Sequence, residues 1–189
     1  MRDVRFRRAT TASPLPGLLH SMGTSSLAAA SPVDGRQSPT AHAVARGTTR
    51  LLHSLGFSVV SELPLASGRR ADLVALGGDG ELWIVEIKSS VADLRADRKW
   101  SDYRRHCDRL FFATAPEVPS GIFPSDAGLI VADAFGATIR SEAPEHRLHA
   151  ATRKRMLLAF ARAAALRLAA LADPEGPARL ESYSAATEI

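Results

Sequence analysis

A carboxylate and an ammonium stand close together in a stretch that otherwise favours a buried strand. Residues 83–90 read WIVEIKSS, and the aromatic and β-branched residues in this run suit a packed, pleated surface. Glu86 and Lys88 lie two positions apart, so both side chains point to the same face of the strand. Burying a charged group without a partner costs several kcal/mol. The pair therefore indicates a place where these charges have a chemical role.

A second carboxylate is expected to lie beside this pair. Asp72 is in the middle of the preceding strand, and the tight turn GGDG separates that strand from the one that carries Glu86. Adjacent antiparallel strands are about 5 Å apart, so Asp72 can reach the neighbourhood of Glu86 and Lys88. Two converging carboxylates repel each other unless a cation lies between them.

This arrangement predicts a divalent metal site. Asp72, Glu86 and the backbone carbonyl of Ile87 offer oxygen ligands of the kind that hold Mg²⁺, or Mn²⁺ in its place, with water completing the coordination. A lysine beside such an ion can orient or deprotonate a water, or neutralise charge that develops on a phosphate. We therefore expect Asp72, Glu86 and Lys88 to be the catalytic residues. The alternative is a solvated ion pair between Glu86 and Lys88, worth at most about 1 kcal/mol.

Helical and strand patterns alternate along the chain and supply the elements that position these residues. A first helix is expected at 41–56, with Thr40 as its N-cap and Gly56 at the end of its last turn; its apolar face comprises Val44, Leu51, Leu52 and Leu55. A second helix is expected from about residue 91, because Ser90 and Asp93 resemble a capping box. A third is expected at 149–172. Strands are expected at 57–65, 69–76, 81–88, 109–114, 128–133 and 137–142. The order α-β-β-β-α-β-β-β-α predicts an α/β domain with a mixed sheet flanked by helices.

The composition suits one globular domain of this class. The chain has 189 residues, of which 46% are hydrophobic and 23% charged. Residues 1–40 lack apolar periodicity and are interpreted as a disordered leader, residues 41–172 as the folded domain, and residues 173–189 as a flexible tail. No apolar run approaches the roughly 20 residues of a membrane span. Cys107 is the only cysteine, which excludes an internal disulfide and favours a cytoplasmic location.

Net charge and short motifs exclude several other classes. Five arginines and two aspartates in residues 1–40 account for +3 of the net charge of +4, so the basic balance says little about the domain. His146 and His149 are too isolated for a zinc site with a single thiol. The chain has no Gly-x-Ser-x-Gly elbow of a serine hydrolase, and GGDG lacks the Lys-Ser/Thr of a phosphate loop.

Several long segments together resemble a known family. GRRADLVAL at 68–76 and WIVEIKSS at 83–90 resemble the PD-(D/E)XK nuclease superfamily, whose signature is an Asp, a hairpin and then Glu/Asp-X-Lys on the next strand. With KWSDYRRHCDRLFFA at 99–113 and GLIVAD at 128–133, they look like the MmcB family of bacterial DNA repair proteins, over about residues 41–171. The resemblance implies a restriction-endonuclease-like fold with an α-β-β-β-α-β core, magnesium-dependent cleavage of DNA, and DNA and other repair proteins as partners.

The resemblance also suggests residues that contact DNA. Lys99 and Tyr103 have the spacing of the Gln-x-x-x-Tyr element of RecB-like nucleases, with lysine in place of glutamine. Arg69 and Arg70 precede the motif strand and are candidates to clamp phosphates, although arginine is also common at hairpin ends. The first helix has no acidic residue to serve as a further metal ligand, and Glu62 is the nearby substitute.

Two functions remain open from the sequence. The first is a DNA nuclease that uses Asp72, Glu86 and Lys88. The second is a catalytically silent protein of the same fold that binds DNA or acts as an adaptor in repair.

Overall fold

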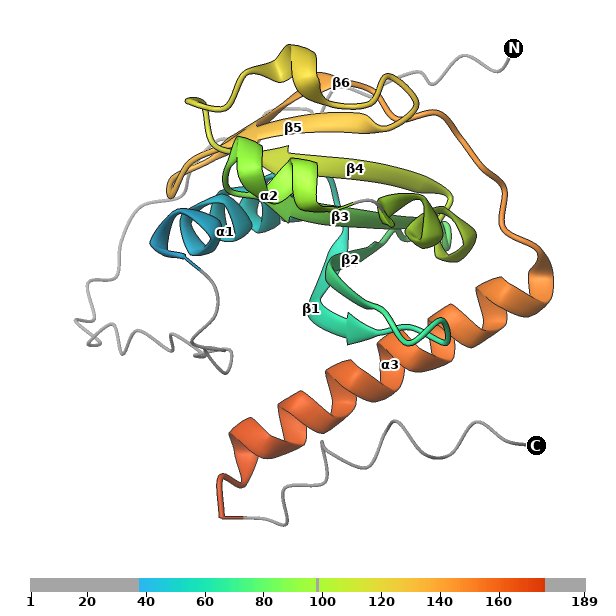
Figure 1. Ribbon diagram of the computed structural model, residues 1–189. Coiled ribbons are helices and arrows are strands. Elements are labelled where there is room, and N and C mark those ends of the chain that lie inside the picture. Colours follow the sequence, from blue (N-terminus) through green and yellow to red (C-terminus); the bar gives the residue numbers. More distant parts are fainter. Residues whose placement is uncertain (1–37, 98, 176–189) are drawn as a thin grey trace, which may run out of the picture. The chain divides into compact units, whose positions relative to one another are not determined.

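Six strands form one mixed sheet in the order of the sequence, β1-β2-β3-β4-β5-β6 (Figure 1). They are β1 (Ser58–Pro64), β2 (Arg70–Leu76), β3 (Leu82–Lys88), β4 (Arg109–Thr114), β5 (Gly128–Ala132) and β6 (Ala137–Ser141). The computed structural model describes residues 38–97 and 99–175, so most of the predicted leader and all but the start of the predicted C-terminal tail lie outside the described residues. Each strand end lies within one residue of its predicted position, and the predicted α/β class is confirmed.

The strand directions follow from the connections. β1, β2 and β3 are antiparallel neighbours joined by short turns, and β5 pairs with β6 in the same way. β3, β4 and β5 are parallel, which requires longer crossovers. The first crossover contains the helix α2 (Val91–Ala96) and the 3₁₀ helix η1 (Trp100–His106), and the second contains the 3₁₀ turn η2 (Ser120–Ile122).

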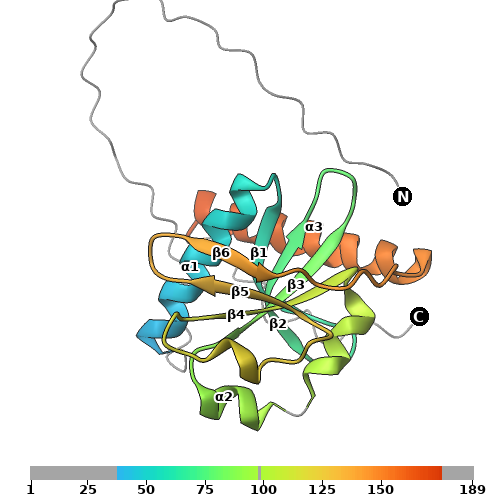
Figure 2. The same cartoon turned by 90° about the horizontal axis from the view of Figure 1, so that it is seen from above.

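The helix α1 (Pro39–Ser54) covers one face of the sheet and lies against β5 and β6 (Figure 2). Val44 and Leu52 are fully buried there with Val85 of β3. The predicted cap at Thr40 is wrong. Ser38 is the N-cap because its Oγ accepts from the Ala41 N–H at 3.1 Å, and a proline follows it at the first helical position.

The predicted apolar face of α1 is also wrong at its last position. Leu55 is 48% exposed, because the helix ends at Ser54 and Leu55 is already the C-cap residue. Gly56 follows with φ of 87°, a conformation that glycine adopts without strain, so the chain reverses there into β1.

The long helix α3 (Ala150–Ala172) packs on the opposite face of the sheet. Met156 and Phe160 are buried in a second hydrophobic cluster with Ile84 of β3 and Leu110 of β4. Farther along, α3 lies against the edge strand β1 (Figure 1). None of the described helices is long and apolar enough to cross a membrane.

The strand β3 is the centre of this architecture. All seven of its residues are buried. Val85 points to the face of the sheet that α1 covers, whereas Ile84 points to the face that α3 covers. Glu86 and Lys88 have the same parity as Ile84, so the two charged side chains enter the α3 side of the sheet.

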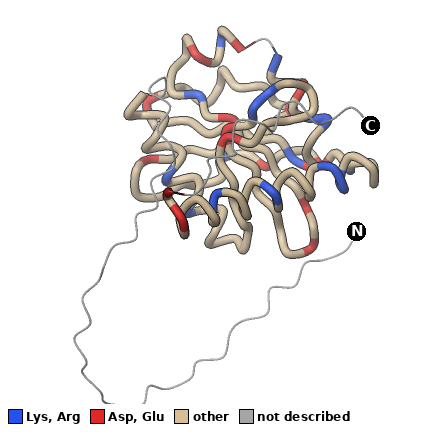
Figure 3. The backbone as a smooth tube through the Cα atoms, turned by 90° about the horizontal axis from the view of Figure 1, so that it is seen from below, with Lys and Arg blue, Asp and Glu red and all other residues tan. Residues whose placement is uncertain are grey.

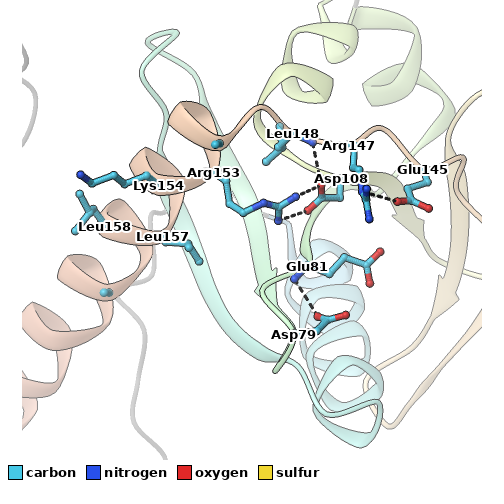
Figure 4. A pocket seen from close by; sticks show the side chains of 12 residues that line it. Asp79, Glu81, Asp108, Glu145, Arg147, Leu148, Arg153, Lys154, Leu157 and Leu158 are labelled. Atoms are coloured by element: carbon cyan, nitrogen blue, oxygen red, sulfur yellow. Dashed lines mark hydrogen bonds and ion pairs between the residues drawn. The ribbon is translucent and has the colours of Figure 1, made fainter.

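An ion pair ties the far end of this sheet to α3. Asp108 accepts hydrogen bonds from Arg153 Nη2 at 2.6 Å, from Arg153 Nη1 at 2.9 Å, and from the N–H groups of Leu82 and Leu148 (Figure 4). Burial by itself raises the pKa of Asp108, but these donors lower it below its usual range on balance. The carboxylate therefore holds the starts of β3, β4 and α3 together.

An open pocket of about 1030 Å³ lies at this end of the sheet, lined by Asp79, Glu81, Asp108, Glu145, Arg153 and Leu157 among others (Figure 4). The Asp108 carboxylate in this pocket already accepts hydrogen bonds from Arg153, Leu82 and Leu148. The β2–β3 turn contributes to the pocket, so it is at the opposite end of the hairpin from Asp72 and Glu86. It is not the site that the sequence motif predicts.

Candidate functional site

Two carboxyl groups interrupt the pairing of β2 with β3. The regular register ends at Leu73 opposite Val85. Beyond it, the Asp72 N–H donates to Glu86 Oε1 at 3.2 Å, and the Ile87 N–H donates to Asp72 Oδ2 at 2.8 Å. Side-chain oxygens thus accept bonds that carbonyls would accept in a regular ladder. The structure brings Asp72 and Glu86 together at the point where the strands separate.

The pairing of β1 with β2 is interrupted at the same level. The pairs Ser61–Leu73 and Leu63–Ala71 place Glu62 opposite Asp72, although these two residues form no ladder pair. Glu62 has φ of 51°, the one positive value of a non-glycine residue in the described part of the chain. Such a conformation costs about 1–3 kcal/mol and commonly occurs at functional sites.

Burial and nearby negative charges raise the pKa of both carboxyl groups. The pKa of Asp72 rises to about 6, chiefly by burial and also by the charge of Glu62, against the hydrogen bond from Ile87. The pKa of Glu86 rises to about 8, again by burial first and then by the charge of Asp72. The charge of Glu62 thus makes the ionised form of Asp72 less favourable, and the charge of Asp72 does the same for Glu86, an effect that a bound cation would reverse.

Lys88 is buried beside these acids, and its side chain is only 7% exposed. Its Nζ donates to Asp97 Oδ2 at 2.6 Å. Burial lowers the pKa of Lys88, but the bond to Asp97 and the charge of Glu86 raise it above its usual value on balance. The lysine is therefore held as a cation within the site.

The segment between β3 and β4 contributes Asp97 and Tyr103 to the surroundings of the site. The predicted helix after Ser90 is present but ends at Ala96, and a separate 3₁₀ helix begins at Trp100. The Ser90 Oγ accepts from the Asp93 N–H at 3.1 Å, and Asp93 Oδ2 accepts from the Ser89 N–H at 3.0 Å, so these residues form a variant of the predicted capping box.

Tyr103 and Lys99 have different environments in this segment. Tyr103 is buried, and its hydroxyl donates to the Arg70 carbonyl at 3.3 Å and is within hydrogen-bonding reach of Glu86. Burial and the charge of Glu86 raise the pKa of this hydroxyl. Lys99 is exposed, and its backbone N–H donates to Asp97 Oδ1 at 3.0 Å. Tyr103 thus belongs to the floor of the site, and Lys99 to its rim.

Two arginines lie at the start of β2, Arg69 directly before the strand and Arg70 as its first residue. Arg69 forms a salt bridge with Asp102 of η1 at 3.2 Å, and Arg70 forms one with Glu62 of β1. The side chain of Arg70 is 55% exposed. These salt bridges connect the start of β2 to η1 and to β1 next to Asp72.

The donor set suits a hard divalent cation. Asp72 and Glu86 supply carboxylate oxygens, and the Ile87 carbonyl lies on the same edge of β3 as the N–H that bonds to Asp72. In the described part of the chain, no group of three or more His, Cys, Asp or Glu side chains is arranged to hold a metal. Mg²⁺ is commonly held by one or two carboxylates together with water and phosphate oxygens, so two carboxylates are sufficient.

Two residues of the site had no distinctive signal in the sequence. Asp97, the partner of Lys88, looked like one of several acidic residues interleaved with basic ones. From the sequence, Glu62 is only a substitute metal ligand. Its electrostatic effect on Asp72 depends on the pairing of β1 with β2.

Comparisons with known proteins agree with the sequence resemblance. A family model described as "DNA repair protein MmcB-like" matches residues 28–175. The SPO1766 protein of unknown function from Silicibacter pomeroyi has a solved structure with 44% identity and a TM-score of 0.73, covering 76% of this chain and 99% of that chain. A repair endonuclease from Pyrococcus abyssi has 18% identity and a TM-score of 0.27, covering 37% of this chain and 34% of that chain, too low a score to support any argument. No curated protein matches the sequence. The match over most of the chain means that this protein belongs to the MmcB-like family of DNA repair proteins.

Proposed function

We propose that the protein is a magnesium-dependent nuclease that cleaves phosphodiester bonds of DNA during repair. The observation that carries the proposal is the pair of interlocked carboxyl groups, Asp72 and Glu86, beside the buried ammonium of Lys88. Burying the charged forms of these two acids without a cation is unfavourable, as the rise of their pKa values to about 6 and about 8 indicates. A site that keeps such groups is a candidate for function because the fold gains nothing from their repulsion.

Each residue has a defined role in this proposal. Asp72 and Glu86, with the Ile87 carbonyl, hold Mg²⁺, or Mn²⁺ in its place. When bound, such an ion supplies Lewis-acid stabilisation of a phosphate and lowers the pKa of a water. Lys88 neutralises charge on the phosphate and orients the attacking water, and Asp97 holds Lys88 in its charged form.

Asp97 also supports a second candidate function. The Lys88 Nζ is engaged with Asp97 Oδ2 at 2.6 Å, so the ammonium is already paired with a carboxylate of the protein. A protein with such a site can bind DNA in repair, or act there as an adaptor, without cleaving it. The two candidates differ in one measurable property, cleavage that depends on a divalent cation.

The test of the function is a cleavage assay with the full-length protein. Labelled single-stranded and double-stranded DNA are incubated with Mg²⁺, with Mn²⁺ and with excess chelator. We expect shortened fragments with either cation and intact DNA with chelator. Equal cleavage in chelator would contradict the metal site, whereas DNA binding without cleavage under any condition would support the second candidate.

Lys99 provides a test of the rim. Because the side chain is exposed at the edge of the site, Lys99→Ala is expected to weaken DNA binding and to reduce the slope of log K against log salt by about one unit. Stability should change little, since Lys99 bonds to Asp97 through its backbone. Binding isotherms at several salt concentrations check this, and curves that superimpose on wild type would exclude a phosphate contact at Lys99.

A further inference from the structure

The helix α3 has one sign of charge along its whole length. It carries Arg153, Lys154, Arg155, Arg162 and Arg167 and contains no Asp or Glu (Figure 3). Arg153 is used in the structural pair with Asp108. Because no acidic residue of the helix offsets these cations, the helix contributes a positive potential, which attracts polyanions.

Arg167 occupies an unusual position on this helix. It follows Phe160 by seven residues, so it lies two turns farther along the same face. Phe160 is buried against the sheet, and the packed face of an amphipathic helix would continue with an apolar residue at 167. The guanidinium instead reaches the edge strand β1, where Nη2 donates to the Glu62 carbonyl oxygen at 3.3 Å.

The charge of Arg167 is not balanced like that of the other partly buried arginines. Arg69, Arg104, Arg109 and Arg153 each form a salt bridge with a carboxylate. Within residues 38–97 and 99–175, Arg167 forms no such salt bridge, and its hydrogen bond to the Glu62 carbonyl uses one of its five donors. Burial lowers the pKa of Arg167 from its usual range, with the charge of Glu62 acting against that effect. A half-buried cation with free donors is suited to an anionic ligand.

The location connects this cation to the acid pair. Arg167 bonds to Glu62, and Glu62 lies opposite Asp72 in the β1–β2 register. Arg70, which lies two residues before Asp72, forms a salt bridge with the same Glu62. Arg167 is therefore one strand away from the Asp72–Glu86 site, on the α3 side of the sheet.

We propose that Arg167 binds a backbone phosphate of DNA next to the phosphate placed at Asp72 and Glu86, so that α3 forms one wall of the DNA path. The inference rests on the proposed function for the position of the second phosphate, but binding at Arg167 requires no cleavage. A planar guanidinium with free donors matches the two oxygens of a phosphodiester. The helix lies outside the sequence motif that suggested the site.

The test compares three variants of the full-length protein in DNA-binding isotherms. Binding of labelled single-stranded and double-stranded DNA is measured in excess chelator at several salt concentrations, so that cleavage has no influence. Arg167→Gln removes the proposed contact, Arg167→Lys keeps the charge, and Arg155→Gln is the matched control because Arg155 is exposed on another face of α3. Thermal melting of each variant shows whether the fold is retained.

We expect Arg167→Gln to weaken binding roughly fivefold to tenfold at 0.1 M salt and to reduce the salt slope by about one unit. Arg167→Lys should recover most of the slope, and Arg155→Gln should remain closer to wild type. Wild-type curves for Arg167→Gln, an equal loss for Arg155→Gln, or no binding by the wild type would overturn the proposal. Binding that depends on Arg167 without any cleavage in Mg²⁺ would retain this phosphate site and reject the nuclease function.

Discussion

Asp72→Asn is expected to reduce magnesium-dependent cleavage of DNA by about 1000-fold or more while the protein stays folded. The amide oxygen of asparagine can still accept from the Ile87 N–H, so the local backbone contact at 2.8 Å is retained. The negative charge that attracts the cation is lost. Initial rates of cleavage at several Mg²⁺ concentrations measure the effect.

The hairpin itself offers the control for this substitution. Asp79→Asn makes the same chemical change at the opposite end of the β2–β3 hairpin, where Asp79 Oδ1 accepts from the Glu81 N–H at 3.0 Å. Cleavage by this variant should match wild type. If Asp72→Asn kept wild-type rates, Asp72 would not be a ligand, and the proposed assignment of the site would be wrong.

Glu86→Gln is expected to stabilise the metal-free protein at pH 8. Glutamine can accept from the Asp72 N–H as Glu86 does, but it carries no charge to bury beside Asp72. The free energy of unfolding should increase by about 2–5 kcal/mol at this pH, as the raised pKa implies. Magnesium-dependent cleavage should be lost, because glutamine lacks the negative charge that holds the cation in the proposed site. The charge of Glu86 would thus reduce stability but serve function.

The sign of this effect follows from the two pKa values of Glu86. The usual pKa is 4.5, and the pKa in the folded protein is about 8. Below the usual value both states are protonated and the charge has no cost. Between the two values the unfolded chain releases its proton while the folded chain keeps it, so stability falls as pH rises and levels off above about pH 8.

Urea unfolding in chelator at pH 5 and pH 8.5 separates this contribution from others. The gap between Glu86→Gln and wild type should be small at pH 5 and large at pH 8.5. The contribution of Asp72 ends near its own pKa of about 6, so it does not account for a loss between pH 6 and pH 8. Adding Mg²⁺ should stabilise the wild type more than the variant. An equal difference in unfolding free energy between variant and wild type at both pH values would show that the pKa of Glu86 is not raised in the folded protein.

Local patterns were enough to predict the elements of this fold. Alternating and continuous apolar runs located all six strands within one residue, since strand faces follow a period of two and the flanking glycines mark turns. The helix ends do not follow from these patterns. Thr40 and Ser38 are both good caps, and the choice depends on which side chain meets the Ala41 N–H, a detail that the periodicity does not contain.

The motif residues were identifiable for a similar reason. Glu86 and Lys88 are conspicuous because charges are rare in a strand whose neighbours are all apolar, and a short hairpin limits where Asp72 can lie. Their convergence therefore followed from local geometry and could be expected from the sequence alone.

The contacts that complete the site depend on the tertiary structure. Lys88 meets Asp97 because the chain after β3 breaks into two short helices, and Glu62 approaches Asp72 because both strand pairings open at one level. Arg167 bonds to a residue 105 positions earlier, through the docking of α3 on the edge of the sheet. The sequence by itself thus determined the strands, the acid pair and the lysine, whose spacing is local. Only the packing of distant elements decided which charges surround them, since no periodicity encodes how strand ends separate or where a helix crosses a sheet.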